Sequence, residues 1–524
     1  MTSAVPGAFC LVLHSHLPWL PGHGVWPLGE EWLHQAWVES YLPLVAELDA
    51  LAAEGQRDVL TLGVTPVLAA QLDHPGMLAD AGTWAGLWEM RAREMGAGRD
   101  AHRREMAAYE YAAAARARTL LATRWAGGGS PVLRSLRDAG VVELLGGPAA
   151  HPFLPLLLPE FAAVALEAGL ADASARLGQR PGGIWSPECG YSPGLADIFA
   201  AAGVDHFLVD EQTVRAAGGH PHAAWRVAGT DVVAVPRDLE VTNLVWSSRS
   251  GYPAAGSYRD FHVREEFTGI RLWSITHPDA GIEHKGGYDP AAASAQLDHD
   301  VAHFVEAVRG RLAGIAESSG APGLVVAAYD TELFGHWWFE GPEFLKNVAL
   351  EFAKPESQVK LISCTDYLDQ FPPAAYVALP EGSWGAESNN SVWLNEDTAW
   401  TWKHIYPSEL AVQQIANSDL WHGNETATRL VKQICRELLL LESSDWQFLI
   451  TTKAARDYAE KRFNTHLEQF RALLDTWRRF EATRQISAEK LQELEAIELR
   501  DSVFQEIDPE LWATTHAVLT HGRP

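Results

Sequence analysis

Two carboxylates stand at the ends of apolar segments in positions where they could do chemistry. Glu188 follows residues 183–186, a short apolar run that ends at Pro187, and runs bounded by Gly and Pro favour strands. Because Pro187 cannot donate to a sheet, we expect the strand to stop there. Asp330 ends a second apolar run, residues 324–329, and aromatic residues follow it. In α/β barrels, residues at the carboxyl ends of strands carry the chemistry.

Two strand-end carboxylates in aromatic surroundings are what glycoside chemistry requires. One attacks or stabilises the anomeric carbon, and the other protonates the leaving oxygen. The chain contains 21 Trp residues, whose ring faces stack on sugars. A single loop Glu is more often a solvated ion-pair partner, but the second stretch of the same construction favours a catalytic pair, Glu188 and Asp330.

The two carboxyl groups need opposite protonation states. The acid must hold its proton until it donates, and an apolar neighbourhood raises a carboxyl pKa. For Asp330 we expect apolar atoms from residues close in sequence, namely Val326, Ala327, Phe334 and Trp337. Glu188 must be ionised and needs hydrogen-bond donors, and the candidates are His14, His16 and His151.

His14 and His16 are two residues apart at a predicted strand end, so both point to one face. They are either hydrogen-bonded structural histidines or part of a substrate site. A His-x-His pair near a carboxylate is also typical of a metal site, which would indicate a metal-dependent hydrolase or polysaccharide deacetylase. No third ligand stands at a fixed spacing, so we expect no metal and no cofactor. Cys189 has no His paired with it in sequence, and we interpret it as a packing residue.

Ordered motifs along nearly the whole chain resemble glycoside hydrolase family 57 and, within it, the 1,4-α-glucan branching enzymes. The segments that carry the resemblance are residues 11–18, 26–31, 62–66, 185–191, 245–247, 251–253, 329–341, 380–385, 392–396 and 444–448. Each motif alone is weak, but their occurrence in the family's order is specific. The resemblance implies a seven-stranded, distorted (β/α) barrel that works without a metal.

The resemblance also implies roles for individual residues. Glu188 matches the family's nucleophile and Asp330 its general acid/base, with retention of configuration. The expected substrate-binding residues are His14, His16, Trp32, His151, Trp246, Trp384, Trp393 and Asp445. The implied reaction cleaves an α-1,4 bond and forms an α-1,6 branch in a glycogen-type glucan. The alternatives are an α-amylase or 4-α-glucanotransferase of the same family, and a non-catalytic glucan-binding protein, which would lack one carboxylate.

Alternating strand and helix patterns predict an α/β catalytic domain over residues 1–375. It carries a helical insertion at about 75–140 and an irregular insertion near the active-site mouth at 212–241. We expect a strand at residues 241–246. Beyond residue 375 the pattern is mainly helical, which predicts an all-α domain over residues 376–524 that completes the glucan groove.

The charge and cysteine content of the chain limit the kinds of binding partner and cellular compartment that we expect. The net charge is −27, which disfavours nucleic acid and anionic lipid surfaces but is indifferent to a neutral α-1,4-glucan. The four cysteines are far apart and indicate reduced thiols. The first apolar run is short and lacks preceding basic residues, so we expect no signal peptide or membrane span and a cytoplasmic location. We expect a monomer or small homo-oligomer.

The segment between Asp210 and Trp246 is shorter than in the best-matched branching enzymes and contains no Tyr. In those relatives a loop tyrosine is thought to exclude water from the active site, whereas actinobacterial relatives look similarly shortened. We therefore expect branching with measurable hydrolysis. Trp225, or the region around Trp384, is expected to form part of the lid.

Overall fold

The computed structural model describes residues 7–26, 28–247 and 249–513, so Pro27 of the second resembling segment lies outside them. Its strands are β1 (Gly7–Ser15), β2 (Leu60–Val64), β3 (Val142–Leu145), β4 (Gly183–Ile184), β5 (His206–Val209), β6 (Trp225–Val227), β7 (Val233–Pro236), β8 (Gly323–Asp330), β9 (Val359–Leu361) and β10 (Tyr376–Val377). None of the described helices is long and apolar enough to cross a membrane.

Parallel strands in the orders β8-β1-β2-β3 and β4-β5-β7 form the wall of the barrel. A parallel bridge between Gly146 and Ile184 joins the two groups. On the other side, the backbone N–H of Asp238 donates to the carbonyl of Val326 (2.7 Å), which links the end of β7 to β8. The wall is therefore closed, as expected for a distorted (β/α)7 barrel.

Side-chain alternation along β1 and β8 explains how the barrel positions its chemistry. On both strands the even-numbered residues from Ala8 to Val12 and from Leu324 to Ala328 pack together in the barrel interior. The odd-numbered residues of β1 pack outwards against the helices. The next inward positions are His14 and Asp330, which are register partners. Because side chains alternate between the two faces of a strand, His14 and Asp330 face the barrel interior at the carboxyl ends of β1 and β8.

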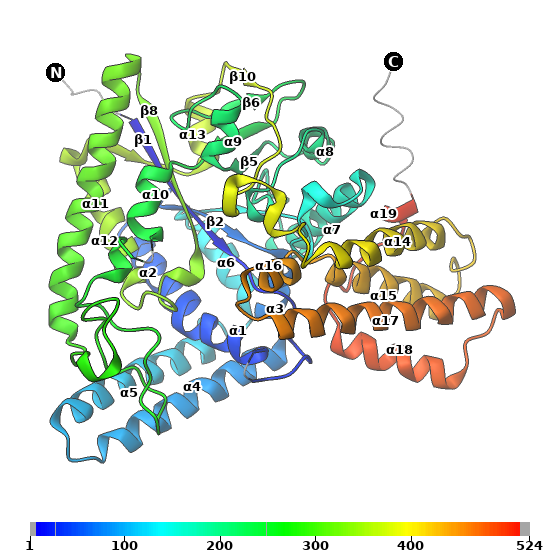
Figure 1. Cartoon of the computed structure of the whole chain (residues 1–524), viewed down its shortest axis with the longest axis horizontal. Coiled ribbons are helices and arrows are strands. Elements are labelled where there is room, and N and C mark those ends of the chain that lie inside the picture. The colour runs from blue at the N-terminus through cyan, green and yellow to red at the C-terminus, as the bar shows by residue number, and fades with distance from the viewer. Residues whose placement is uncertain (1–6, 27, 248, 514–524) are drawn as a thin grey trace.

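Helices surround the barrel and form a long excursion between β2 and β3 (Figure 1). The helices of this part are α1 (Glu30–Ala36), α2 (Leu42–Ala53), α3 (Pro66–Leu72), α4 (Pro75–Gly96), α5 (Ala101–Ala122), α6 (Gly129–Asp138), α7 (Pro159–Leu177), α8 (Leu195–Ala201), α9 (Glu211–Ala216), α10 (Leu239–Trp246), α11 (Pro290–Ser319), α12 (Gly341–Ala353) and α13 (Cys364–Gln370). The expected helical insertion corresponds to α4, α5 and α6, of which α4 and α5 form a projecting hairpin.

Two local predictions are wrong. Residues 241–246 form the helix α10 rather than a strand, because the Asp238 side chain caps the helix by accepting from the Val241 N–H (3.0 Å). The segment 212–241 is not irregular, since it contains α9 and two strands. Of these strands, β7 is part of the barrel wall and β6 pairs antiparallel with it.

Trp225 lies at the end of the barrel opposite the catalytic carboxylates. It starts β6, and the carbonyl of nearby His222 accepts from the Leu324 N–H at the beginning of β8 (2.9 Å). Asp330 is six residues further along β8, which is about 20 Å in an extended strand. The expectation that Trp225 forms part of a lid is therefore wrong.

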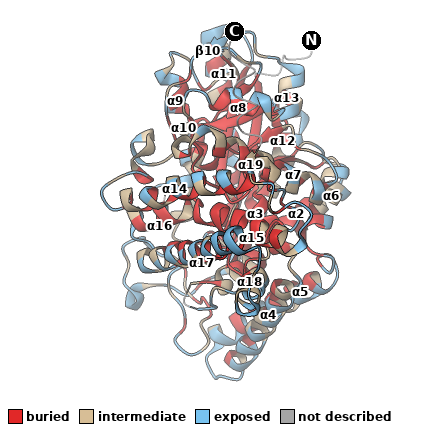
Figure 2. Ribbon diagram, turned by 90° about the vertical axis from the view of Figure 1, so that its right-hand side faces the viewer, coloured by how far each residue is buried: buried red, intermediate tan, exposed pale blue. Residues whose placement is uncertain are grey.

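The chain ends in a group of helices beside the barrel: α14 (Ala399–Ala416), α15 (Glu425–Leu441), α16 (Asp445–Thr452), α17 (Arg456–Thr483), α18 (Ala488–Arg500) and α19 (Glu510–Ala513). Figure 2 shows their buried residues facing inwards, with exposed residues along the outer turns of α17 and α18. The buried residues of α15 and α17 belong to a core that also contains residues of α7. The C-terminal helices thus share a hydrophobic core with α7 of the barrel domain.

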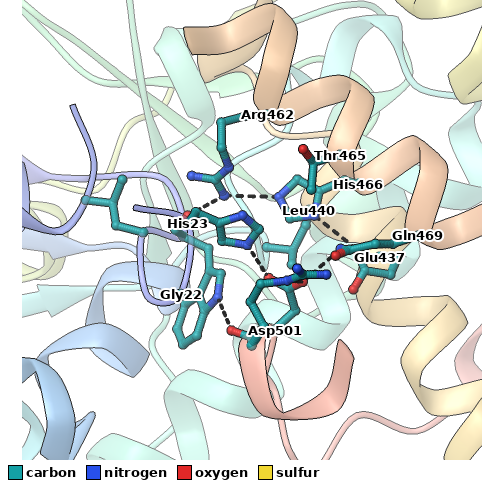
Figure 3. Close-up of polar contacts among 12 residues, drawn as sticks. Gly22, His23, Glu437, Leu440, Arg462, Thr465, His466, Gln469 and Asp501 are labelled. Carbon is teal, nitrogen blue, oxygen red and sulfur yellow. Dashed lines mark hydrogen bonds and ion pairs between the residues drawn. The ribbon is translucent and has the colours of Figure 1, made fainter. Parts of the chain in front are cut away.

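A buried polar cluster ties the loop after β1 to these helices (Figure 3). His23 Nε2 and Asp501 Oδ1 lie 2.6 Å apart. Gln469 donates from Nε2 to Asp501 and to Glu437, both at 2.9 Å. Arg462 donates to the carbonyl of Trp19 (2.5 Å). Since buried polar groups are costly unless paired, the cluster fixes the helices against the loop.

Candidate active site

Glu188 lies in a tight turn directly after β4, and its backbone is strained. Its φ is 61°, and that of Cys189 is 50°, a left-handed conformation that side-chain-bearing residues adopt only when the surroundings impose it. Ser186 Oγ donates to the carbonyl of Gly190 (2.6 Å) and closes the turn. The turn presents the Glu188 carboxylate at the carboxyl end of the barrel.

The segment that carries Trp384 is attached to this turn by its backbone. Gly382 and Tyr191 exchange both N–H···O bonds, at 2.9 and 3.0 Å, and the Trp384 N–H donates to the Glu188 carbonyl (2.8 Å). The indole Nε1 of Trp384 then donates to Glu188 Oε2 (2.7 Å). Trp384 is thus a direct partner of the predicted nucleophile.

Asp330 has the environment of an acid that holds its proton. Burial and, to a smaller extent, the Glu332 charge raise its pKa to about 7 against the opposing effects of His16 and Arg237. Glu332 accepts hydrogen bonds from the Tyr41 hydroxyl and from the His16 backbone N–H. The sequence predicts a raised pKa for Asp330 from apolar neighbours alone, whereas in the structure the Glu332 carboxylate contributes as well as desolvation.

The pKa of Glu188 is also raised to about 7, mainly by burial and in smaller part by the charges of Asp330 and Asp445, against the lowering effect of the Trp384 hydrogen bond. The Asp330 charge thus contributes to the raised pKa of Glu188, whereas Glu332 is the carboxylate that contributes to the raised pKa of Asp330. A retaining mechanism pairs an ionised nucleophile with a protonated acid. This is the state that glycoside chemistry begins from.

The donors to Glu188 are not the histidines expected from the sequence. Ser444 Oγ lies 3.5 Å from Glu188 Oε1 and 3.0 Å from His151 Nδ1. His151 Nε2 is 3.1 Å from His14 Nε2, so one of these nitrogens donates and the other accepts. Burial lowers the pKa of both imidazoles well below the usual range. His151, and His14 behind it, therefore reach Glu188 through Ser444 as neutral rings.

His16 connects the barrel to Asp445 of α16. Its Nε2 lies 2.9 Å from Asp445 Oδ2, and its Nδ1 lies 3.0 Å from Thr65 Oγ1. Burial raises the pKa of Asp445, but the charge and hydrogen bond of His16 outweigh this and hold it below its usual range. Like the Trp384 segment, this contact is anchored by backbone, because the Ser444 N–H donates to the His151 carbonyl (3.1 Å).

The sequence spacing offers no third metal ligand beside the histidines, but the fold brings Asp445 close to two of them. Donor atoms of His16, His151 and Asp445 lie within 4.8 Å of one another, a grouping that could hold a metal ion. Each already has a hydrogen-bond partner among the described residues. An ion at this position would have to replace the His16–Asp445 contact.

The predicted substrate-stacking tryptophans have different surroundings. Trp246 is 41% exposed and 5.9 Å from the Trp384 ring, so its face is open to a ligand. Trp32 is partly buried against the core. Trp393 is fully buried and stacks on Phe153 at 4.0 Å, so the prediction that it stacks on substrate is wrong.

Sequence reasoning missed three contributors to the site. Ser444 was passed over although it lies next to Asp445 in a resembling segment. Trp185 stacks on His14 at 4.5 Å, and its position before Glu188 was a usable signal. Arg237, ion-paired with Asp210 (2.7 Å), lies 5.3 Å from the Trp384 ring, and no local pattern indicates it.

Comparison with known families agrees with this fold. The model of glycosyl hydrolase family 57 matches residues 10–380, and the model of the 1,4-alpha-glucan branching enzyme C-terminal domain matches residues 404–512. The chain therefore belongs to glycosyl hydrolase family 57.

Among curated proteins, a probable 1,4-alpha-glucan branching enzyme of Mycobacterium tuberculosis strain H37Rv is 44% identical over 495 residues, covering 90% of this chain and 92% of that protein. Among solved structures, a branching enzyme of Thermococcus kodakaraensis has a TM-score of 0.90 at 32% identity, covering 97% of this chain and 96% of that one. The alpha-amylase AmyC of Thermotoga maritima has a TM-score of 0.86 at 25% identity, covering 97% and 99%.

Proposed function

We propose that this protein is a 1,4-α-glucan branching enzyme that cleaves an α-1,4 bond and transfers the chain to a glucan 6-hydroxyl. The observation that carries the proposal is the pair of buried carboxyl groups Glu188 and Asp330, both held at the carboxyl end of the barrel with raised pKa values. The 44% identity to a probable branching enzyme and the match to the branching-enzyme C-terminal model support transfer to glucan over hydrolysis.

The proposed mechanism is a double displacement with retention. Glu188 attacks the anomeric carbon while Asp330 donates its proton to the leaving oxygen. A covalent glucosyl-enzyme forms, and the ionised Asp330 then removes the proton of the incoming 6-hydroxyl. Trp384 and Ser444 stabilise the Glu188 carboxylate before attack and after release.

Other residues hold substrate rather than react with it. We assign the donors and acceptors around the cleaved bond to His14, His16, His151 and Asp445, and the stacking surface to Trp246. Trp32 is retained as a peripheral contact. The four free, buried cysteines support a reducing compartment, so we propose a cytoplasmic role in the synthesis of a glycogen-type glucan. We also propose a catalytic domain up to residue 375 and a helical domain beyond it.

The test is the reaction on amylose, with α-1,6 linkages counted after debranching and compared with new reducing ends. Branching predicts that α-1,6 linkages rise faster, with some hydrolysis because the loop tyrosine is absent. Glu188→Gln and Asp330→Asn should each lose several orders of magnitude in kcat, whereas Glu489→Gln, an exposed carboxylate on α18, should be unchanged. Reducing ends in excess from the start would identify an amylase instead.

A further inference from the structure

A cavity lies away from the catalytic cluster. It has a volume of about 520 Å³ and lies between the α4–α5 hairpin, the starts of α11 and α12, and the loop 259–288. Figure 1 shows this hairpin below the lower end of α11. The volume is in the range of small-molecule sites. The cavity lining contains neither Glu188 nor Asp330, nor any of the three site histidines.

Aromatic rings line this cavity from several elements. Trp84 and Trp88 of α4 lie 6.1 Å apart. Tyr109 of α5 lies 6.1 Å from Phe339, which follows the catalytic strand. Both tryptophans are only partly buried, and Tyr109 is 37% exposed. Partly exposed rings on facing elements form a surface that can stack on the apolar faces of a ring-shaped ligand.

The polar groups of the cavity are of both kinds and are incompletely paired. Arg91, Arg116 and Arg264 come from α4, α5 and the 259–288 loop; they are exposed to solvent and make no hydrogen bond or ion pair with another described residue, so they are free to bind a ligand. The same holds for the carboxylate of Glu343 at the start of α12. Glu340 is buried; its Oε1 accepts from the Arg259 backbone N–H (3.2 Å), its carboxyl also interacts with the Tyr288 hydroxyl, and its Oε2 makes no further hydrogen bond with a described residue. An unpaired buried oxygen is costly, and a ligand donor would satisfy it.

This combination selects among ligand classes. A phosphate-bearing ligand would meet the Glu343 carboxylate beside the arginines, and a lipid tail would displace the water around the three arginines and Glu343 without replacing its hydrogen bonds. A neutral polyhydroxylated ring satisfies all of them, because its hydroxyls donate to carboxylates and accept from guanidinium groups, and its apolar faces pack on aromatic rings. The ligand indicated is a sugar without charge.

We propose that this cavity is a second α-glucan-binding site, the identity of the glucan resting on the proposed function. Phe339 and Glu340 of the cavity lining lie nine and ten residues after Asp330, in the segment that joins β8 to α12. The proposal requires a glucan polymer long enough to reach both places. Binding at the cavity raises the effective concentration of glucan at the active site without a new catalytic contact.

The test is calorimetric titration of the full-length Glu188→Gln protein with maltoheptaose. We expect two binding events. Tyr109→Ala and Arg264→Ala should weaken one event about tenfold, the equivalent of about 1.4 kcal/mol, and leave the other unchanged. The matched control is Tyr111→Ala, which is 41% exposed on the same helix and does not line the cavity. In the active enzyme, Tyr109→Ala should raise KM for amylose several-fold at unchanged kcat.

A single binding event that neither variant alters would overturn the proposal, as would tighter binding of glucose 6-phosphate than of maltoheptaose to the Tyr109-sensitive event. The proposed function is tested separately. If two events are seen but the active enzyme forms no α-1,6 linkages, the second site stands and the branching assignment fails. If the active enzyme forms α-1,6 linkages but only one binding event is seen, the branching assignment stands and the second site fails.

Discussion

The Trp384 indole should set the lower pH limit of activity. Its Nε1 donates to Glu188 Oε2 (2.7 Å), and a hydrogen bond to the charged form of an acid favours ionisation. Trp384→Phe retains an aromatic ring and removes only this donor. The pKa of Glu188, about 7 in the unmodified protein, should therefore rise.

The size of the effect follows from the strength of such bonds. A hydrogen bond to a charged group contributes about 1.5–3 kcal/mol, and about 1.4 kcal/mol corresponds to one pKa unit. An increase of one unit reduces the ionised fraction of Glu188 at pH 7 from about one half to about one tenth, so the rate falls about fivefold. One pH unit lower, the loss approaches about tenfold. Because Glu188 and Asp330 interact, the profile reports the pair.

The assay is kcat/KM for branching of amylose between pH 5 and 9. For Trp384→Phe the acid limb should move upwards by at least about one unit. The control is Trp246→Phe, since Trp246 lies 5.9 Å from the Trp384 ring and has no hydrogen bond to Glu188. An equal loss at every pH, with an unmoved acid limb, would refute the reasoning and make Trp384 a sugar contact only.

Four further outcomes are expected. Asp445→Asn should move the acid limb of the same profile downwards by less than about one unit, because the Asp445 charge raises the pKa of Glu188; an upward shift would contradict this. Activity should survive exhaustive EDTA treatment, because the donors of His16, His151 and Asp445 already have hydrogen-bond partners; loss that zinc restores would reverse the conclusion. Trp225→Ala should leave the ratio of α-1,6 linkages to reducing ends unchanged, and a tilt towards hydrolysis would return Trp225 to the lid. The folded-state pKa of Glu188 is raised from 4.5 to about 7, so its ionisation destabilises the fold above about pH 7 and not below pH 4.5. Glu188→Gln should therefore exceed the unmodified protein in free energy of unfolding at pH 8 by about 1–3 kcal/mol, with no difference at pH 4; denaturant unfolding at both pH values measures this.

Much of the barrel was predictable because its strands are short apolar runs with clear ends. The expected runs ending near His14, Glu188 and Asp330 correspond to β1, β4 and β8. β7 was missed because it is a four-residue strand within a segment rich in Gly, His and charged residues. The apolar residues of α10 favour a strand because they do not reveal the Asp238 cap.

The catalytic pair could be predicted from the sequence, but the residues that surround it could not. Glu188 and Asp330 are marked by their own neighbours in sequence. Their partners are not, since Ser444 is 256 residues from Glu188 and Trp384 is 196 residues away. The burial of Trp393 likewise depends on Phe153, a contact that no local pattern indicates.

The polar cluster around His23 has a consequence for the order in which the molecule can be made. Asp501, the partner of His23, is 478 residues further along the chain. At typical translation rates of about 5–20 residues per second, roughly 25–100 s separate the synthesis of the two. During that time β1 also waits for β8, whose last residue pairs with His14 across 316 residues of sequence. A nascent chain that has passed Glu188 but not yet reached Trp384 and Ser444 therefore lacks both donors to the nucleophile. Until β8 is made, it also exposes an unpaired edge of β1 to the chaperones and proteases that act on unfinished proteins.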